Sequence, residues 1–198
     1  KYMSPKIKIT LKKGLKILLI SDFFAVLATG MIGPIYAIFV QDIGGDILDA
    51  SWAYFAYMIS CGIVLYLMGI WENKVKNKGL FVVAGYALNA LGCLSYFFVG
   101  NQFQLVITQI ILGLSQAVLS PVFDSLYSDF VNRKNKAREW ADWEAMLYVT
   151  NAIAAIVGGY FVASFGFKNL FLVMFVVALL ATLASTGMLK GKKYLSES

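Results

Sequence analysis

The sequence predicts an all-α membrane protein with six transmembrane helices, and three observations lead to this prediction. The 198-residue chain is 60% hydrophobic with a mean hydropathy of +0.73, whereas soluble domains are at most about half apolar. Sixteen of the 17 Lys and Arg residues lie in four short stretches, at 1–16, 74–78, 133–138 and 190–193. Each interval between successive stretches has room for two membrane crossings of about 20 residues.

The first three helices follow from the apolar segments between these stretches. The first is expected near 15–40 and ends before an acidic segment, 41–49, that contains no cation. The second is expected near 50–71 and ends just before a basic stretch. The third is expected near 79–99 and ends before Gly100. Basic residues in short loops favour the cytoplasmic side, so the acidic segment is expected to be external.

The last three helices continue the same alternation. The fourth is expected near 102–131, the fifth near 139–165 and the sixth near 168–189. Both termini are then cytoplasmic. We expect a cytoplasmic lead-in at 1–14, a transmembrane domain at 15–189 and a cytoplasmic tail at 190–198, in the cytoplasmic membrane. The third and sixth helices are the most uniformly apolar and are expected to face lipid. The aromatic belts at the two membrane surfaces are expected to include Trp52, Tyr54, Trp71, Trp140 and Trp143.

Composition also excludes several functions. The formal net charge is +6, but the cations lie at helix ends, where anionic lipid headgroups account for them better than nucleic acid does. The chain contains no histidine, which removes Ser-His-Asp catalysis and the usual zinc sites. Cys61 and Cys93 both lie inside expected spans and are interpreted as small apolar residues. We therefore expect neither an enzyme nor a bound cofactor or metal.

An internal repeat relates the first and fourth helices. Residues 34–42 read PIYAIFVQD and residues 121–129 read PVFDSLYSD, and each has an Asp eight positions after the Pro. The first helix runs outward at this point and the fourth runs inward. Similar sequence in opposite orientation predicts an inverted repeat of three plus three helices.

Polar residues form stripes on three of the helices, at helical spacings of three and four. Such residues are costly in lipid, so the stripes are expected to face protein or a water-filled cavity. We interpret them as a substrate and ion path, with interhelical hydrogen bonding as the alternative. The candidate path residues are Asp22, Thr29, Tyr36, Gln109, Gln116, Ser120, Asp124, Glu144 and Asn151. The small-residue stripe Asn151, Ala155 and Gly159 is expected to serve close helix packing. Asp124 and Asp129 are also expected to pair with cations at the cytoplasmic helix ends.

Several motifs together resemble the major facilitator superfamily. The segment 69–78 reads GIWENKVKNK, which is similar to the family's loop of Gly, three residues, Asp, Arg, any residue, Gly and two basic residues. Asn73 stands in place of the Asp. The segment 109–121 is similar to the family's Arg-x-x-x-Gly pattern followed by Pro, with Gln109 in place of the Arg. Gly158 and Gly159 match the fifth helix of the family, but the Gly-Pro of antiporter members is replaced by Ala154-Ala155.

The resemblance implies a six-helix half of a family that usually has twelve helices. It implies alternating access by two such units, here a parallel homodimer through the second and fifth helices. Ser60, Gly62, Asn151, Ala155 and Gly159 would then allow the two copies to approach closely. It also implies a cytoplasmic latch, whose candidate residues are Gly69, Asn73, Lys74, Lys78, Asp129, Arg133 and Arg138.

The expected function is therefore transport of a small neutral or cationic solute. An anionic substrate is less favoured because the expected spans contain no interior Lys or Arg. Two alternatives stay open. The chain could be a non-transporting six-helix scaffold or partner subunit, or an excised half of a twelve-helix transporter. The expected partners are membrane lipid, a second copy and a small-molecule substrate, with no nucleic acid.

Overall fold

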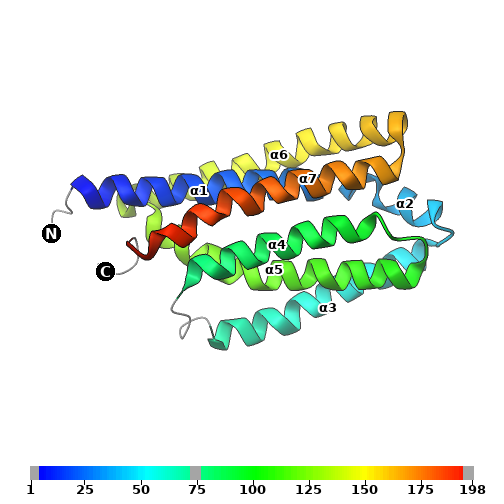
Figure 1. Ribbon diagram of the computed structural model, residues 1–198, viewed down its shortest axis with the longest axis horizontal. Coiled ribbons are helices and arrows are strands. Elements are labelled where there is room, and N and C mark those ends of the chain that lie inside the picture. The colour runs from blue at the N-terminus through cyan, green and yellow to red at the C-terminus, as the bar shows by residue number, and fades with distance from the viewer. Residues whose placement is uncertain (1–4, 72–76, 194–198) are drawn as a thin grey trace.

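The computed structural model describes residues 5–71 and 77–193 as a bundle of roughly parallel and antiparallel helices (Figure 1). Six helices or helix pairs in this part of the chain are long and apolar enough to cross a membrane. The main helices are α1 (Pro5–Gly30), α2 (Tyr36–Asp42), α3 (Ile47–Trp71), α4 (Lys78–Tyr96), α5 (Gln102–Phe130), α6 (Lys136–Phe165) and α7 (Phe167–Ser185). Short 3₁₀ helices occur at η1 (Gly33–Ile35), η3 (Arg133–Asn135) and η4 (Thr186–Lys193). The expected all-α membrane architecture is confirmed.

The first span differs from the single continuous helix expected near 15–40. Helix α1 begins at Pro5, runs through most of the expected lead-in and ends at Gly30. The chain then passes through η1, with Pro34 near its start, before α2 completes the crossing. Proline supplies no backbone N–H and fixes φ, so a Gly-Pro pair here interrupts the helix. Pro121 does not interrupt its helix: α5 is helical on both sides of it.

The six spans are arranged in an open series rather than a closed ring. Helix α3 packs on α5, α5 on α4, α4 on α7, α7 on α1 and α1 on α6. The two helices at the ends of this series, α3 and α6, are the least buried spans. The middle helices α4 and α7 pack against each other, and α1 and α5 lie on either side of them.

The third and sixth helices were expected to face lipid, and this order shows that each also buries one face against other helices. Helix α4 buries one face that includes Tyr86, Cys93 and Tyr96, and α7 buries Phe171 and Met174. Their outer faces stay exposed. An apolar helix surface can face lipid or pack against protein, so apolar composition alone did not reveal the buried face.

Two glycines set the closest approaches between helices. Gly113 of α5 faces α3, where a β-carbon would lie 2.2 Å from the hydroxyl oxygen of Ser60. Gly158 of α6 faces Met31, and a β-carbon there would lie 2.1 Å from the Met31 carbonyl oxygen. Both ends of the helix series are thus joined to the bundle at glycines. Small residues allow close backbone contact of this kind between membrane helices.

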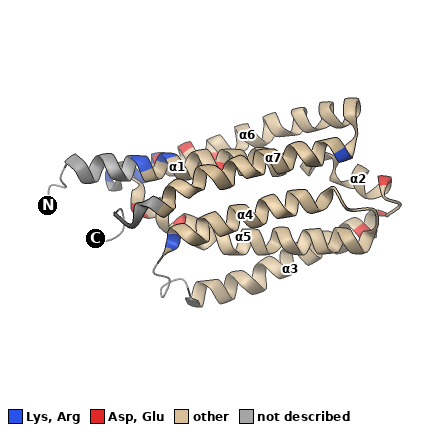
Figure 2. Cartoon of the chain, in the orientation of Figure 1, with Lys and Arg blue, Asp and Glu red and all other residues tan. Residues whose placement is uncertain are grey.

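Charged residues lie mainly at the two ends of the bundle, and the apolar middle separates them (Figure 2). The start of α1, the end of η4 and the connection from α5 to α6 lie at the same end (Figure 1). At the opposite end, two aspartates cap α3. Asp46 accepts hydrogen bonds from the backbone N–H of Leu48 and Asp49, and Asp49 accepts one from the N–H of Asp46. Their side chains therefore stabilise the start of α3.

Candidate functional site

A buried carboxylate lies where α1, α4 and α6 meet. Asp22 of α1 is only 9% exposed. Its Oδ2 accepts a hydrogen bond of 2.8 Å from Nε1 of Trp143 on α6, and its Oδ1 accepts one of 3.4 Å from the hydroxyl of Tyr86 on α4. We call these three residues the Asp22 site. Both donors are neutral, so the negative charge of an ionised Asp22 is stabilised only by dipoles within the described residues.

An aromatic cluster holds Trp143 in place. Trp143 lies 5.4 Å, centroid to centroid, from both Phe123 and Tyr127 of α5, and 5.5 Å from Trp140 of its own helix. Tyr127 is itself fixed by a 2.5 Å hydrogen bond that its hydroxyl donates to the carbonyl of Glu139. Rings packed at these distances contribute beyond their buried area. The indole that contacts Asp22 is therefore preorganised.

A second carboxylate lies near the first. Asp124 of α5 is exposed and lies close enough to Asp22 for the two to interact electrostatically. A like charge nearby disfavours the ionised form of the buried Asp22, which favours a proton or a cation at that carboxylate. The site thus combines negative charge with a set of aromatic rings, which is a suitable surrounding for a positively charged ligand.

The two neighbouring tryptophans give a direct test of this geometry. Trp143→Phe removes the donor to Asp22, and we expect a loss of stability of about 1.5–3 kcal/mol, the range for hydrogen bonds to charged groups. Trp140 is the matched control, because its buried Nε1 has no hydrogen-bond partner among the described residues. Trp140→Phe shortens a packed ring but breaks no hydrogen bond, so its loss of stability should be clearly smaller than that of Trp143→Phe. Thermal unfolding in detergent measures both, and equal losses would contradict the structure.

A second polar cluster lies between α5 and α4. Gln109 of α5 is 6% exposed and donates a 3.1 Å hydrogen bond from its Nε2 to the hydroxyl of Tyr96 on α4. The hydroxyl of Tyr36 is buried without a hydrogen-bond partner among the described residues. Tyr96 is also stacked on Phe171 at 5.1 Å. Gln109 is therefore an interhelical contact in this structure.

The other predicted path residues are more open. Gln116, Glu144 and Asn151 are exposed, whereas Thr29 and Ser120 are half-buried. The Thr29 hydroxyl bonds to the carbonyl of Ala25, and the Asn151 amide to the carbonyl of Leu147. The structure therefore places Asp22 and Asp124 near each other. Gln116 of α5 and Glu144 and Asn151 of α6 lie on exposed sides of their helices, and Thr29 belongs to α1. Their role in a path stays a prediction.

The predicted latch is only partly described. Asn73, Lys74 and the side chain of Arg133 lie outside the described residues. Lys78 donates a hydrogen bond to Ser125 of α5. Arg138 pairs with Asp142 of its own helix at 3.9 Å. Gly69 and Asp129 are exposed, and the latch also stays a prediction.

Within the chain, the contacts of α6 use the residues next to the small stripe. Ala154 packs on Gly30 of α1, and Gly158 packs on Met31 just after α1, whereas close packing of Ala155 and Gly159 against a second copy stays a prediction. A shift of one residue turns a helix position by about 100°, since a turn contains about 3.6 residues. Gly159 has no atom within 4 Å of where its β-carbon would lie and faces outward.

Comparison with known proteins decides the family. The sequence profile of the Major Facilitator Superfamily matches residues 18–193. The chain belongs to this superfamily. The match covers all six spans, so the resemblance found in the motifs extends to the whole bundle.

Individual members of the superfamily are distant. An uncharacterized transporter of Methanocaldococcus jannaschii is 22% identical over 88% of this chain and 45% of its own length. The multidrug resistance protein MdtG of Yersinia enterocolitica is 27% identical over 85% of this chain and 41% of its own length. The chain thus spans less than half of these two relatives. The uncharacterized transporter YitZ of Bacillus subtilis is 22% identical over 73% of this chain and 87% of its own length.

Sequence reasoning about this superfamily member singled out Asp22 but missed its partners. Trp143 was assigned to the aromatic belt, whereas the structure places it against Asp22 and within the aromatic cluster. Tyr86 carried no signal. Each is separated from Asp22 by many residues, 121 for Trp143 and 64 for Tyr86. The clue that was available is Trp143 itself, an indole whose N–H requires an acceptor when it is buried.

Proposed function

We propose that the protein moves a small cationic or neutral solute across the cytoplasmic membrane by alternating access. The observation that carries the proposal is the Asp22 site, a buried carboxylate held by two neutral donors beside a rigid aromatic cluster. Ionisable residues inside membrane spans are costly and are usually functional. A multidrug resistance protein among the relatives agrees with transport of small organic molecules.

The site favours a cation over a neutral solute. The described spans carry their carboxylates without an interior Lys or Arg, and Asp22 forms no ion pair within the described residues. A bound organic cation would supply the missing positive charge and contact aromatic faces as well. A proton could occupy the same carboxylate when the cation leaves, which would couple the two movements.

The transport site requires a second six-helix unit, which we propose is a parallel second copy. Helices α3 and α6 are the least buried spans and end the open helix series. Gly62 of α3 and Gly159 of α6 have no atom near the position of a β-carbon, so a partner helix could approach there. Ser60 and Asn151 pack within this chain instead, near Gly113 and Gly30. A second half of a longer chain would occupy the same face.

Cysteine crosslinking tests this contact. In a background without the native cysteines, chains carrying Gly62→Cys and Gly159→Cys should form disulfide-linked dimers on mild oxidation in lipid. Cysteine pairs must lie within about 7 Å, Cα to Cα, to be bridged. Leu91→Cys on the exposed face of α4 is the matched control and should stay monomeric. Crosslinking through Leu91 alone would contradict the proposed interface and favour the scaffold alternative.

The helix contacts also support the inverted repeat of three plus three helices. Exchanging α1 with α5, α3 with α6 and α4 with α7 maps the series of helix neighbours onto itself. Asp22 precedes Pro34 by twelve residues, and Gln109 precedes Pro121 by twelve. Both are held by a tyrosine of α4. Polar residues at equivalent positions of α1 and α5 are consistent with a midplane path between the two helices.

Alternating access requires each six-helix unit to move as a body. The ends of α4, α5 and α6 are tied together in a way that supports this. Lys78 bonds Ser125, and the Lys136 ammonium donates a 3.2 Å hydrogen bond to Ser128. The basic loops at this end favour the cytoplasmic side. Rocking of two rigid units about the Asp22 site would then expose it to each side in turn.

The experiment that tests transport uses the purified chain in proteoliposomes. DNA is trapped inside the vesicles, and a fluorescent lipophilic cation such as ethidium is added outside. Ethidium that enters binds the DNA, and the increase in its fluorescence reports uptake. We expect uptake above that of empty liposomes, inhibited by other organic cations. Uptake no faster than in empty liposomes, by a chain that crosslinks as a dimer, would overturn transport of this substrate class and support the scaffold alternative.

A further inference from the structure

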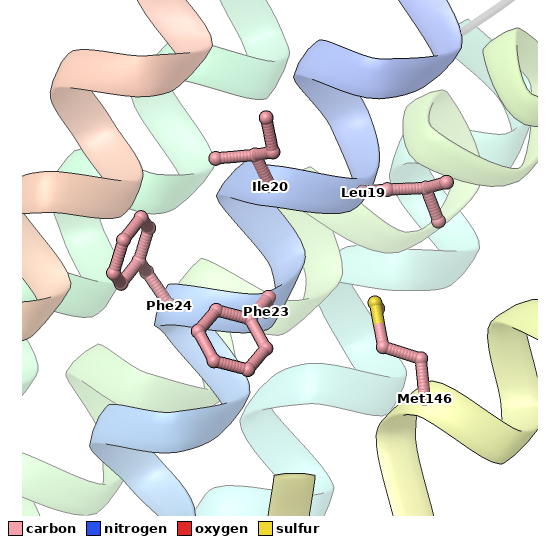
Figure 3. Close-up of a pocket in the computed structure, with 5 residues that line it drawn as sticks. All are labelled: Leu19, Ile20, Phe23, Phe24 and Met146. Carbon is pink, nitrogen blue, oxygen red and sulfur yellow. The ribbon is translucent and has the colours of Figure 1, made fainter.

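An apolar cleft on the surface of α1 has none of the three residues of the Asp22 site in its lining. Its walls are Leu19, Ile20, Phe23 and Phe24 of α1 and Met146 of α6. Its volume is about 310 Å³, and every lining residue is apolar. Figure 3 shows Met146 extending from α6 toward α1, while Phe24 lies on the other side of the cleft, toward α7. The cleft is open, and Ile20 is 50% exposed.

Two lysines follow the same face of α1 toward the end of the membrane span. Lys13, Lys16, Ile20 and Phe23 are separated by three or four residues, so their side chains lie in one row along the helix. Lys13 and Lys16 are exposed, and neither forms an ion pair among the described residues. At about 1.5 Å per residue, Lys16 lies about 6 Å along the axis from Ile20. The positive charge of the two lysines thus begins about one helical turn from the apolar cleft.

This arrangement matches the two parts of a lipid. We propose that the cleft binds one anionic glycerophospholipid of the cytoplasmic leaflet, with an acyl chain between Phe23, Phe24 and Met146 and the phosphate at Lys13 and Lys16. An apolar chain gains from contact with the cleft walls, and lysine ammonium groups bind phosphate as point charges. The acidic residue one turn before Met146 on α6, Asp142, is paired with Arg138 at 3.9 Å, which reduces its repulsion of a phosphate.

The two parts of the site predict lipid selectivity. A lipid with a zwitterionic headgroup has no net charge, so it would fill the cleft but gain little binding free energy from the lysines. A basic residue near an anionic membrane surface contributes about 1 kcal/mol, which corresponds to roughly five-fold in affinity. Loss of Lys16 should therefore weaken binding of the anionic lipid roughly five-fold, and it should hardly change binding of phosphatidylcholine. The inference does not depend on transport.

Photolabelling tests the site directly. The purified chain is placed in phosphatidylcholine nanodiscs with a small fraction of phosphatidylglycerol that carries a diazirine on its acyl chain. Peptide mapping should find labelling concentrated around Phe23, Phe24 and Met146, well above that of the same probe with a choline headgroup. Lys16→Gln should lower labelling by phosphatidylglycerol roughly five-fold. Ile20→Trp, which fills the cleft, should lower labelling by both probes.

Lys134→Gln is the matched control. It removes the same charge from an exposed position in η3, outside the row on α1, and should leave labelling of the cleft unchanged. Equal losses in Lys16→Gln and Lys134→Gln would mean that the lipid responds only to overall charge, and this would overturn the proposal. Labelling of the cleft no stronger than at Leu80 and Leu91, exposed on α4, would overturn it as well.

Discussion

Gly158→Ala is expected to lower the thermal stability of the protein, although alanine is the better helix former. The added β-carbon would lie 2.1 Å from the carbonyl oxygen of Met31, and 2.7 Å from its carbonyl carbon. These are backbone atoms that no rotamer change can move, so α1 and α6 must separate. Overpacking costs about 1–3 kcal/mol, whereas replacing glycine in a helix gains about 1 kcal/mol. We expect a net loss of up to about 2 kcal/mol, measured by thermal unfolding in detergent.

The adjacent glycine makes the comparison decisive. Gly159→Ala brings the same gain in helix propensity, but its β-carbon meets no atom within 4 Å. It should therefore be neutral or stabilising in the isolated chain. If the two alanine variants unfold at the same temperature, the contact between α6 and Met31 is not as close as the structure has it. Destabilisation by Gly159→Ala alone would instead place α1 against the other face of α6.

Helix positions could be predicted closely because each apolar segment is bounded by charges or turn residues. The expected fourth helix, 102–131, differs from α5 by one residue at its end. The break after Gly30 was not predicted, although Gly33 and Pro34 signal it. Hydropathy is unaffected by a short 3₁₀ turn, because the turn is as apolar as the helix on either side. The extension of α1 back to Pro5 was also not predicted. A helix makes its own backbone hydrogen bonds outside the membrane as well, so it can continue beyond the apolar segment that hydropathy detects.

Packing partners were harder to predict than helix positions. The sequence contains adjacent glycines at 158 and 159, and periodicity does not tell which of them meets a neighbouring helix. The same difficulty affected α4 and α7, whose apolar surfaces suit both lipid and protein. Only the three-dimensional order of the helices distinguishes the buried face. Long-range contacts of this kind leave no local pattern in one sequence.

The candidate site was predicted in the same incomplete way. An aspartate in the middle of an apolar segment stands out, so Asp22 was identified from its cost in lipid alone. Asp124 was identified from its place in a polar stripe of the fourth helix. Trp143 was missed as a donor to Asp22 because tryptophan is common at membrane surfaces, and its position in the sequence near a span end favoured that interpretation over a buried contact. Tyr86 was missed because nothing in the sequence marks it as a partner of Asp22.

Asp22→Asn is expected to abolish binding of an organic cation while the fold is preserved. Asparagine is nearly the same size, and its carbonyl oxygen can still accept the hydrogen bond from Trp143. Its amide group can donate to the Tyr86 oxygen. The charge is lost, and removing one partner of a buried charge pair costs about 2–5 kcal/mol, or roughly 30- to several thousand-fold in affinity. Binding of ethidium to the purified protein, followed by fluorescence anisotropy, measures the loss.

Asp42→Asn is the control for total charge. Asp42 is the last residue of α2, in the same span, and is exposed at the opposite end from the basic loops. Its loss changes the net charge of the chain by the same amount, so cation binding should change little. Equal weakening by both variants would indicate a general electrostatic effect, and the Asp22 site would then not be the binding site.

Asp22→Asn also separates the two interpretations of the polar residues, a substrate and ion path or interhelical hydrogen bonding. If Asp22 serves only to hold α1, α4 and α6 together, asparagine preserves both contacts, and binding of a cation should be unaffected. A neutral amide also costs less to bury than a carboxylate, so Asp22→Asn should then be at least as stable as the original protein. A more stable protein that has lost cation binding is the result expected of a functional carboxylate. The cost of burying that charge is understandable only if a ligand or a proton compensates for it during the working cycle.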